Sequence, residues 1–229
     1  LLYICTPNNP TGSVAELETF ELLLELADKH DFVIASDECY SEIYLDEERP
    51  PTGLLEAASS LGRDDFKRCL VFHSLSKRSN VPGMRSGFVA GDADLIENFF
   101  KYRTYQGCAM APYTQQASIA AWKDEKHVQE NRRLYREKFD RVIEILQPVV
   151  NVSLPLATFY LWLQTPQSDV EFTRGLYQQQ NVTVLPGSFL SRTVNGINPG
   201  EKRVRIALVA SLAECEKAAS RIVTHINEL

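Results

Sequence analysis

The sequence predicts an α/β fold in which a mostly parallel sheet with flanking helices is followed by a smaller α+β domain. Three short apolar runs in the first half have the length and the branched side chains of strands covered on both faces: Leu1–Cys5, Phe32–Ser36 and Cys69–His73. A helical pattern separates the first two runs. A strand, a helix and a second strand in this order form a βαβ unit, and its two strands run parallel.

The first helix has a clear start signal. Ser13-Val14-Ala15-Glu16 matches a capping box, in which the serine and the glutamate satisfy backbone amides at the start of a helix. Apolar residues follow at helical spacing, at Leu17, Phe20, Leu24 and Ala27. Further along, Arg85–Gly91 is a strand candidate, and a helix is expected from about Asp92.

The remaining elements are shorter. From Ala111 to about Gln147 the pattern is helical almost throughout. Two more capping boxes, which begin at Ser168 and Ser211, each predict a helix. Four strands are predicted in this part of the chain, at Asn151–Leu154, Thr158–Gln164, Val182–Leu185 and Arg203–Val209.

This change in pattern predicts two domains with a boundary near residue 122. Residues 1–122 would be the C-terminal part of a large domain, and residues 123–229 a small C-terminal domain. The chain starts directly with a buried strand, without an initiator Met or a charged signal-peptide region. A buried parallel strand seldom begins a natural protein, so we expect this chain to be a fragment of a longer one.

Composition argues against several classes of protein. The 229 residues carry a formal net charge of −6, whereas nucleic-acid-binding proteins show clustered Lys and Arg. The five cysteines are scattered without a C-x-x-C pair, which fits a reducing cytoplasm, and the four histidines lack the spacing of metal ligands. No apolar run approaches the roughly 18 residues of a membrane span. We expect a cytoplasmic protein that binds no metal, nucleic acid or membrane.

Polar side chains follow the predicted strands where each strand ends. Residues 6–12 (TPNNPTG) follow the first strand, residues 37–40 (DECY) the second, and residues 74–77 (SLSK) the third, with Arg85 eight residues after Lys77. Ligands of an open parallel sheet bind beyond the carboxyl ends of its strands, so these groups are expected to meet in one crevice. Each group alone has a simpler interpretation as a turn, a helix cap, the edge of the core or a surface charge. Their order and spacing together favour a binding site.

With these residues the chain resembles the class I/II aminotransferases of pyridoxal-phosphate fold type I, and the resemblance runs through all 229 residues. It rests on four motifs in a fixed order: N-P-T-G at residues 9–12, D-x-x-Y at 37–40, S-x-S-K at 74–77 with arginine at 85, and R-V-R-I at 203–206. One such motif is weak support, whereas the ordered set is highly specific. The resemblance implies the cofactor pyridoxal 5′-phosphate (PLP).

The resemblance assigns catalytic roles to three residues. The lysine matching Lys77 holds PLP covalently, the aspartate matching Asp37 pairs with the pyridine nitrogen, and the tyrosine matching Tyr40 binds the ring hydroxyl. A carboxylate beside that nitrogen favours its protonated form, which draws electrons from the carbanion formed at the substrate Cα. Once the substrate amine displaces it, Lys77 is free to move a proton, first as general base and then as general acid.

Further residues are implied to bind the cofactor and the substrate. Those matching Ser74, Ser76 and Arg85 bind the PLP phosphate. The asparagine matching Asn9 reaches the ring hydroxyl and is also taken as a substrate contact. The arginine matching Arg205 holds the substrate α-carboxylate, which a planar guanidinium can meet with two hydrogen bonds.

Within the family, three stretches resemble the bacterial N-succinyldiaminopimelate aminotransferases: Thr158–Leu163, Gln180–Leu190 and Val204–Ala210. This resemblance implies that an amino group passes from glutamate to N-succinyl-2-amino-6-ketopimelate in lysine and diaminopimelate biosynthesis. Arg192 and Arg203 are interpreted as surface charges, although Arg192 is also a candidate contact for an acidic substrate tail.

Part of the family pattern precedes residue 1, namely the N-terminal arm, the first phosphate-binding loop and the aromatic ring that stacks on PLP. We therefore expect the isolated fragment to bind PLP poorly and to be inactive. The resemblance implies a homodimer for the full-length protein, which acts on small amino and keto acids.

Three alternatives stay open at this point. The first is another fold type I PLP enzyme, such as a β-lyase, a decarboxylase or an aminocyclopropane-type synthase, since all of these need the same lysine and aspartate. The second is a regulator that joins this fold to a DNA-binding domain, although the negative charge and Arg205 favour catalysis. The third is a structural fragment without chemistry of its own.

Overall fold

The computed structural model describes residues 1–229, which divide into two compact units. The first unit comprises residues 1–9 and 13–132, and the second comprises residues 10–12 and 133–229. The sequence predicts a boundary near residue 122, whereas this division falls inside one long helix, α6 (Lys126–Leu146). Each unit is described here by itself.

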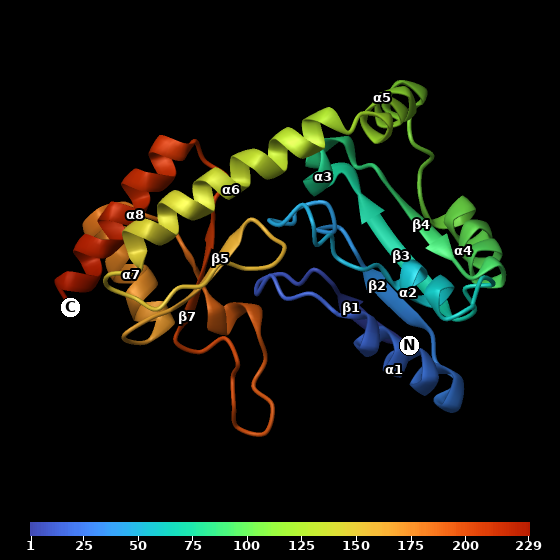
Figure 1. The fold of residues 1–229 in the computed structure, drawn as a ribbon, viewed down its shortest axis with the longest axis horizontal. Helices are drawn as coiled ribbons and strands as arrows, with labels where there is room; N and C mark the ends of the chain where they lie inside the picture. The colour runs from blue at the N-terminus through green and yellow to red at the C-terminus, as the bar shows by residue number, and fades with distance from the viewer. The chain divides into compact units, whose positions relative to one another are not determined.

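The first unit is built on a four-stranded sheet in the order β1-β2-β3-β4 (Figure 1). The strands β1, β2 and β3 run parallel, and β4 runs antiparallel to β3. Their bounds are Leu2–Cys5, Ile34–Asp37, Cys69–Ser74 and Gly87–Gly91. The predicted strands are all present with shifted ends, and the predicted α/β class with a mostly parallel sheet is confirmed.

The register of the strands brings their polar ends to one edge of the sheet. Cys5 lies opposite Asp37, which lies opposite Phe72, so β1 and β2 end at the same level and β3 continues two residues further to Ser74. Because β4 is antiparallel, its first residue, Gly87, pairs with Ser74 at this same edge. A Cβ at Gly87 would lie 2.4 Å from the carbonyl oxygen of His73, so the close approach of β4 to β3 requires glycine here.

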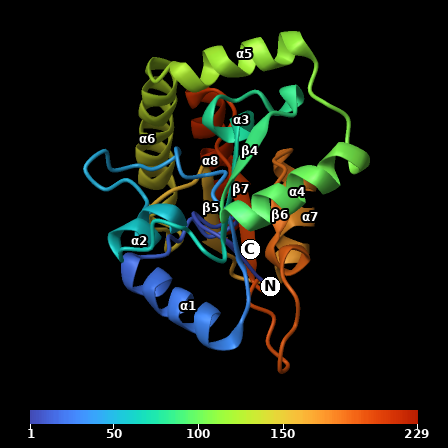
Figure 2. The ribbon, with the colours of Figure 1, turned by 90° about the vertical axis from the view of Figure 1, so that its right-hand side faces the viewer.

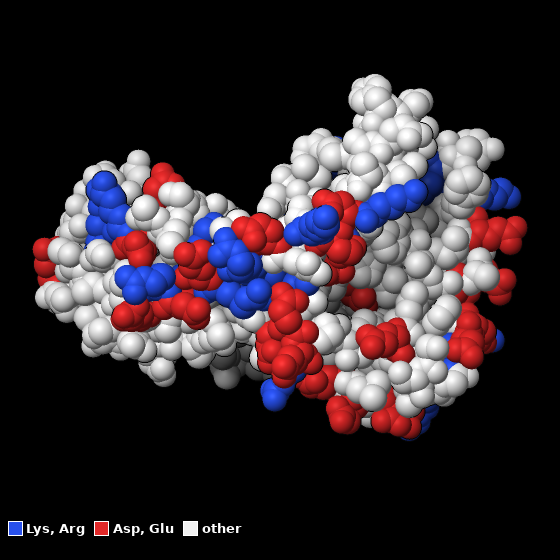
Figure 3. Space-filling view, turned by 45° about the horizontal axis from the view of Figure 1, so that its top comes forward, with Lys and Arg blue, Asp and Glu red and all other residues white.

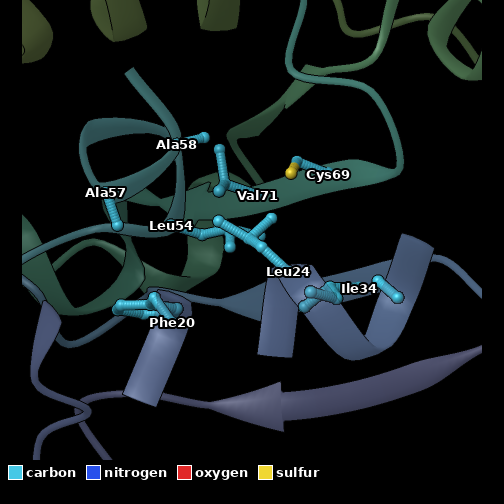
Figure 4. Packing of buried hydrophobic residues seen from close by; sticks show 9 residues of the cluster. Phe20, Leu24, Ile34, Leu54, Ala57, Ala58, Cys69 and Val71 are labelled. Atoms are coloured by element: carbon cyan, nitrogen blue, oxygen red, sulfur yellow. The ribbon is translucent and has the colours of Figure 1, made fainter. Parts of the chain in front are cut away.

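Two helices, α1 (Leu17–His30) and α2 (Leu54–Ser60), cover one face of this sheet. Figure 4 shows how their side chains meet those of β2 and β3 in a closely packed core. Phe20 and Leu54 are completely buried, and so is Ile34 of β2. Burial of such apolar groups is the main favourable term in folding, and here it fixes the sheet against its helices. The core consists of Phe20, Leu24, Ala27, Ile34, Leu54, Ala57, Ala58, Cys69 and Val71.

The start of α1 differs from the prediction. The helix begins at Leu17 with Glu16 at the N-cap, so the capping box predicted at Ser13 is wrong. The residues before Glu16 are held in an extended path by other partners. The backbone amide of Ala15 donates to the hydroxyl of Thr6 at 2.8 Å, and the amide of Asn8 donates to the carbonyl of Ser13 at 2.8 Å. The loop after β1 thus binds the backbone of the residues at which the helix was expected to start.

Three further helices complete the first unit: α3 (Leu75–Arg78), α4 (Ala93–Gln106) and α5 (Pro112–Lys123). The helix predicted from about Asp92 is confirmed as α4, and its N-cap Asp92 accepts hydrogen bonds from two amides, at 3.0 and 3.2 Å. Figure 2 shows α4 alongside β4. The long helical stretch predicted after Ala111 is confirmed as α5 and α6.

The second unit contains a three-stranded antiparallel sheet in the order β5-β7-β6 and two helices, α7 (Asp169–Gln180) and α8 (Leu212–Asn227). The strand bounds are Tyr160–Gln164 for β5, Leu185–Pro186 for β6 and Arg203–Ala207 for β7. The capping box at Ser211 is confirmed. Ser168 is the N-cap of α7, but its side chain makes no cap hydrogen bond, so the capping box predicted there is wrong. The strand predicted at Asn151–Leu154 is wrong: the segment forms no ladder, Leu154 is exposed, and the following Pro155 has no amide to donate.

The surface carries both signs of charge. On the face shown in Figure 3, Lys and Arg side chains are interspersed with Asp and Glu. Ion pairs of α6 include that of Arg141 with Glu216 of α8, at 2.9 Å. Such exposed pairs contribute little to stability. None of the helices combines the length and the apolar composition that crossing a membrane requires.

Candidate functional site

Asp37 ends β2, and its carboxylate accepts two hydrogen bonds. Its Oδ1 accepts a hydrogen bond from the backbone amide of Cys39 at 3.1 Å, and its Oδ2 lies 3.4 Å from the hydroxyl of Tyr3, which donates to it. Strand alternation puts Tyr3, Cys5 and Asp37 on the same face of the sheet, opposite the face that α1 and α2 cover. The carboxylate is thus held in place at the carboxyl edge from two sides.

Lys77 lies on α3, the single helical turn that follows β3 directly. The thiol of Cys39 interacts electrostatically with the Lys77 ammonium and with the Asp37 carboxylate. Burial raises the pKa of the Cys39 thiol to about 12, the Asp37 carboxylate adds to the rise, and the Lys77 ammonium acts in the opposite direction. An acid and an amine from two different strand ends therefore both act on one half-buried thiol.

Ser74, Ser76 and Arg85 line one cavity of about 350 Å³, a size within the range of small-ligand sites. The hydroxyls of Ser74 and Ser76 are 2.8 Å apart, and the amide of Ser76 donates to Ser74 at 3.1 Å. Arg85 has a left-handed backbone with φ of 53° and donates from Nη1 to the carbonyl of Pro82 at 2.9 Å. Two hydroxyls and a guanidinium at a cavity wall suit an anion such as a phosphate.

The other two residues predicted for the first unit lie in the segments after β1 and β2. The backbone amide of Asn9 forms a hydrogen bond with the Cys5 thiol, which lowers the Cys5 pKa against the larger effect of burial. Tyr40 is buried, and its carbonyl accepts a hydrogen bond from the amide of Ile43 at 2.9 Å. The predicted roles of both side chains toward a cofactor stay predictions.

Arg205 belongs to the second unit, on β7, where it lies opposite Trp162 of β5 and Leu185 of β6. Its guanidinium stacks over the ring of Tyr160 at 4.3 Å from the centroid. The interpretation of Arg203 as a solvent-facing residue needs correction. The two arginines lie two positions apart on one strand and so share a face, and both are half-buried. Strand geometry does not distinguish them, and the choice of Arg205 rests on the resemblance.

Sequence reasoning missed the contributions of Tyr3 and Cys39 around Asp37. The signal for Tyr3 was present, because a period of two places it on the face of Cys5, next to the end of β2. Cys39 gave no such signal, since its amide reaches Asp37 only through the turn that follows the strand.

Comparison with known proteins identifies the family. The model of the family described as "Aminotransferase class I and II" matches residues 1–222. The chain belongs to this family. The predicted resemblance is thereby confirmed over residues 1–222.

Curated relatives of this aminotransferase chain include the LL-diaminopimelate aminotransferases of Maridesulfovibrio salexigens and Nitratidesulfovibrio vulgaris strain Hildenborough. They are 33% identical over 226 residues and 34% identical over 227 residues, respectively, and each alignment covers 97% of this chain and 55% of the relative. The chain thus spans about half the length of the curated relatives it matches.

Solved structures agree with this assignment. An aminotransferase of Neisseria meningitidis is 58% identical, with a TM-score of 0.93 over 97% of this chain and 56% of the other. A probable N-succinyldiaminopimelate aminotransferase of Thermus thermophilus is 30% identical, with a TM-score of 0.83 over 98% of this chain and 58% of the other.

The residues of the first unit fit the cofactor of this family. PLP carries a phosphate, an aldehyde that reacts with an amine, and a ring nitrogen that a carboxylate can keep protonated. The chain offers the anion-binding cavity at Ser74 and Arg85, the amine of Lys77 and the fixed carboxylate of Asp37, all near one edge of the sheet.

Proposed function

We propose that the protein containing this chain transfers an amino group between an amino acid, with glutamate as the expected donor, and a keto acid, using PLP. The observation that carries the proposal is one edge of the sheet, at which the oriented Asp37 carboxylate and the cavity lined by Ser74, Ser76 and Arg85 lie, with Lys77 on the turn that follows β3. A member of the class I and II aminotransferase family with an acid and an amine so placed has the two groups that transamination requires.

In the proposed mechanism Asp37 and Lys77 divide the proton chemistry. When bound, PLP supplies an electron sink for the bond broken at the substrate Cα. Asp37 would keep the ring nitrogen protonated, and the hydrogen bonds from Cys39 and Tyr3 keep its carboxylate in one orientation. With PLP bound, Lys77 would move the proton that leaves the substrate Cα, acting first as base and then as acid.

The remaining predicted residues bind and orient. Ser74, Ser76 and Arg85, which line one cavity, would hold the phosphate through hydroxyl and guanidinium hydrogen bonds. Asn9 and Tyr40 would bind the ring hydroxyl, and Asn9 would also contact the substrate. Arg205 binds the substrate α-carboxylate, and its stacking on Tyr160 restricts the plane of its guanidinium.

For the substrate we propose a compound of the diaminopimelate pathway. The likeness to the Thermus thermophilus protein favours the N-succinylated keto-diacid, and the identity with LL-diaminopimelate aminotransferases favours the free diaminopimelate. The full-length protein should be supplied with LL-diaminopimelate or with its N-succinyl derivative as amino donor and 2-oxoglutarate as acceptor. Glutamate formed from only one of the two donors identifies the substrate, and glutamate from neither removes this assignment.

The reaction itself is tested by Lys77→Ala in the full-length protein. The variant should lose the visible absorption band of enzyme-bound PLP and the transfer of the amino group from glutamate. Lys67→Ala is a matched control, because Lys67 precedes β3 at the opposite edge of the sheet. A Lys77→Ala variant that keeps both the band and turnover would contradict the proposed site.

Product analysis separates transamination from the chemistry of related PLP enzymes. A transaminase needs a keto-acid acceptor and releases no ammonia or carbon dioxide, whereas a β-lyase releases ammonia and a decarboxylase carbon dioxide. We also propose a homodimer for the full-length protein. Sedimentation equilibrium gives the mass in solution, and a monomer that is fully active would exclude a requirement for the dimer.

A further inference from the structure

Three of the residues proposed to bind PLP are next in sequence to a residue whose side chain makes contacts away from the proposed PLP site. Glu38 follows Asp37, His73 precedes Ser74, and Arg78 follows Lys77. Along β3 alternate side chains face opposite sides, so His73 lies on the face away from Ser74. Together with two aromatic residues these neighbours form a continuous row of contacting side chains, here called the support row: Glu38, His73, Phe88, Trp122 and Arg78.

Glu38 forms one end of the support row and is only 4% exposed. Its Oε1 accepts a hydrogen bond from the amide of Leu54 at 2.9 Å, at the start of α2, and its Oε2 lies 3.2 Å from Nε2 of His73. The backbone amide of Glu38 donates to the carbonyl of Phe72 at 2.9 Å. Glu38 therefore ties the residue after Asp37 to both β3 and α2.

Aromatic contacts continue the row from β3 to α5. The ring of His73 stacks on that of Phe88 with centroids 4.9 Å apart, and Phe88 meets Trp122 edge-on at 5.0 Å. Phe88 is the register partner of His73 on β4. Aromatic pairs at these distances prefer defined relative orientations, so these contacts fix the rings relative to one another in addition to burying them.

Arg78 forms the other end of the row, and its charged side chain is 95% buried, being 5% exposed. Nη1 donates to the carbonyl of Ala121 at 2.9 Å, Nη2 pairs with Glu125, and the guanidinium lies 5.0 Å from the centroid of the Trp122 ring. Burying a guanidinium is costly unless it is paired and hydrogen-bonded, and the contacts made here join α3 to the end of α5 and to the turn that follows it.

The helix that carries Lys77 needs such support. With four residues, α3 is a single turn, and a helix of this length is unstable by itself. Next to Arg78, the hydroxyl of Ser79 lies 2.8 Å from Nε2 of His127, which adds a second tie on the same side. The position of the Lys77 backbone is thus set by residues that follow it in the chain.

We propose that Glu38 and Arg78, the two charged ends of the support row, are positioning residues for the reaction: they fix Asp37 and Lys77 relative to each other from outside the cofactor site. This inference rests on the proposed function. It assigns Arg78 a purpose that differs from that of a surface charge or of a cofactor ligand, since its partners are Ala121, Trp122 and Glu125. A shift of a reacting group by about 1 Å can cost on the order of 100-fold in rate, so small displacements should be measurable.

The test uses Glu38→Gln, Arg78→Met and Arg78→Lys in the full-length protein loaded with PLP. Arg63→Met is the matched control, because Arg63 also forms a two-bond ion pair, with Asp28 at 2.8 and 3.2 Å, but near the start of β3. Four quantities are measured for each variant: the midpoint of urea unfolding, the pH titration of the PLP absorption band, kcat and KM.

We expect Arg78→Met and Glu38→Gln to lower kcat roughly 10- to 100-fold with little change in KM, because the substrate-binding groups are untouched. The titration midpoint of the PLP band should move by about one pH unit, since the distance between the amine and the carboxylate changes. Arg78→Lys keeps the charge without the fork and should fall between the wild type and Arg78→Met. Arg63→Met should lower stability alone.

The inference is overturned if Arg78→Met and Glu38→Gln lower the unfolding midpoint as Arg63→Met does while kcat and the titration stay at wild-type values. A failure of the proposed function is distinct, because in that case the wild-type protein shows neither the PLP band nor amino transfer. If Arg78→Met does not fold, Arg78→Lys and Glu38→Gln still provide the same comparison.

Discussion

The backbone amide of Cys39 donates a 3.1 Å hydrogen bond to Oδ1 of Asp37, and this bond closes the turn in which β2 ends. The carboxylate thus receives its orientation from its own chain, before any ligand binds. A group that is preorganised in this way costs no reorganisation during a reaction.

Replacement of Asp37 should therefore affect chemistry more than folding. In the full-length protein we expect Asp37→Asn to lower kcat roughly 100-fold or more, because the amide no longer stabilises a positive ring nitrogen. Asn has nearly the same shape and can still accept the Cys39 bond, so the urea midpoint should stay close to that of the wild type. Steady-state kinetics and equilibrium unfolding measure the two quantities. A large loss of stability at unchanged kcat would assign Asp37 a structural role only.

Cys39 should be an unreactive thiol despite its place beside the site. Burial, with a contribution from Asp37, raises its pKa to about 12, so at pH 8 almost none of it is thiolate, the form that reacts. We expect iodoacetamide at pH 8 to modify the exposed Cys108 well before Cys39, and the rate at Cys39 to keep rising about tenfold per pH unit up to about pH 10. Peptide mass mapping after timed alkylation gives both rates. A rate at Cys39 that levels off near pH 8 would contradict the raised pKa, and the protein unfolded in urea serves as the reference.

The core between α1 and the sheet should be sensitive to truncation at Phe20. This side chain is 0% exposed, and Phe20→Ala should lower the free energy of unfolding by roughly 3–5 kcal/mol through lost burial and the cavity left behind. Leu22→Ala on the same helix removes a side chain that is 56% exposed, and it should change stability by less than about 0.5 kcal/mol. Urea titrations of the two variants make the comparison, and equal losses would show that Phe20 is not packed as described.

In the second unit, Asp169 should contribute stability that depends on pH. Although burial opposes ionisation, the hydroxyl and the amide of Ser188, at 2.6 and 2.9 Å, together with the amide of Lys202 hold the pKa of Asp169 below its ordinary value. A lowered pKa means that the folded state favours the carboxylate. The resulting stability is complete above the ordinary Asp pKa of about 4 and is lost as the pH falls through the lowered value.

We expect Asp169→Asn to lower the free energy of unfolding by about 1–3 kcal/mol at pH 7, because the amide replaces only part of these hydrogen bonds. The gap between the variant and the wild type should narrow as the pH falls below the ordinary Asp pKa and through the lowered pKa of Asp169, because the wild-type carboxyl then becomes protonated. Thermal unfolding at pH 7 and at pH 3 tests this, and a gap that widens at low pH would contradict it.

The strands of the first unit could be predicted because their apolar runs are short, branched and bounded by turns. That the polar residues after these strands lie at one edge of the sheet could be predicted from the parallel direction of the strands alone. The helix α2 was not predicted, since Leu54–Ser60 is only two turns long and its apolar residues do not repeat often enough to show a helical period.

Other features depend on contacts between distant parts of the chain, which no local pattern reports. The start of α1 moved to Leu17 because the hydroxyl of Thr6 competes for the amide of Ala15. Arg78 looks like a surface charge in the sequence, and only the fold brings it to Ala121, Trp122 and Glu125. The partners that bury an arginine can lie anywhere in the chain, so this group could not have been found by inspection.

The pairing of Ser74 with Gly87 has a consequence for the length of the segment between them. Both ends of this segment are anchored in the ladder between β3 and β4. The segment is therefore a loop with fixed ends, and it contains Lys77 and Arg85. An inserted residue could be absorbed by sliding β4 one step, but that step would turn Phe88 and Val89 to the wrong faces and place a Cβ against the carbonyl that Gly87 now clears. An exchange of one side chain within this loop leaves the pairing of Ser74 with Gly87 intact, whereas an insertion adds length between two fixed ends.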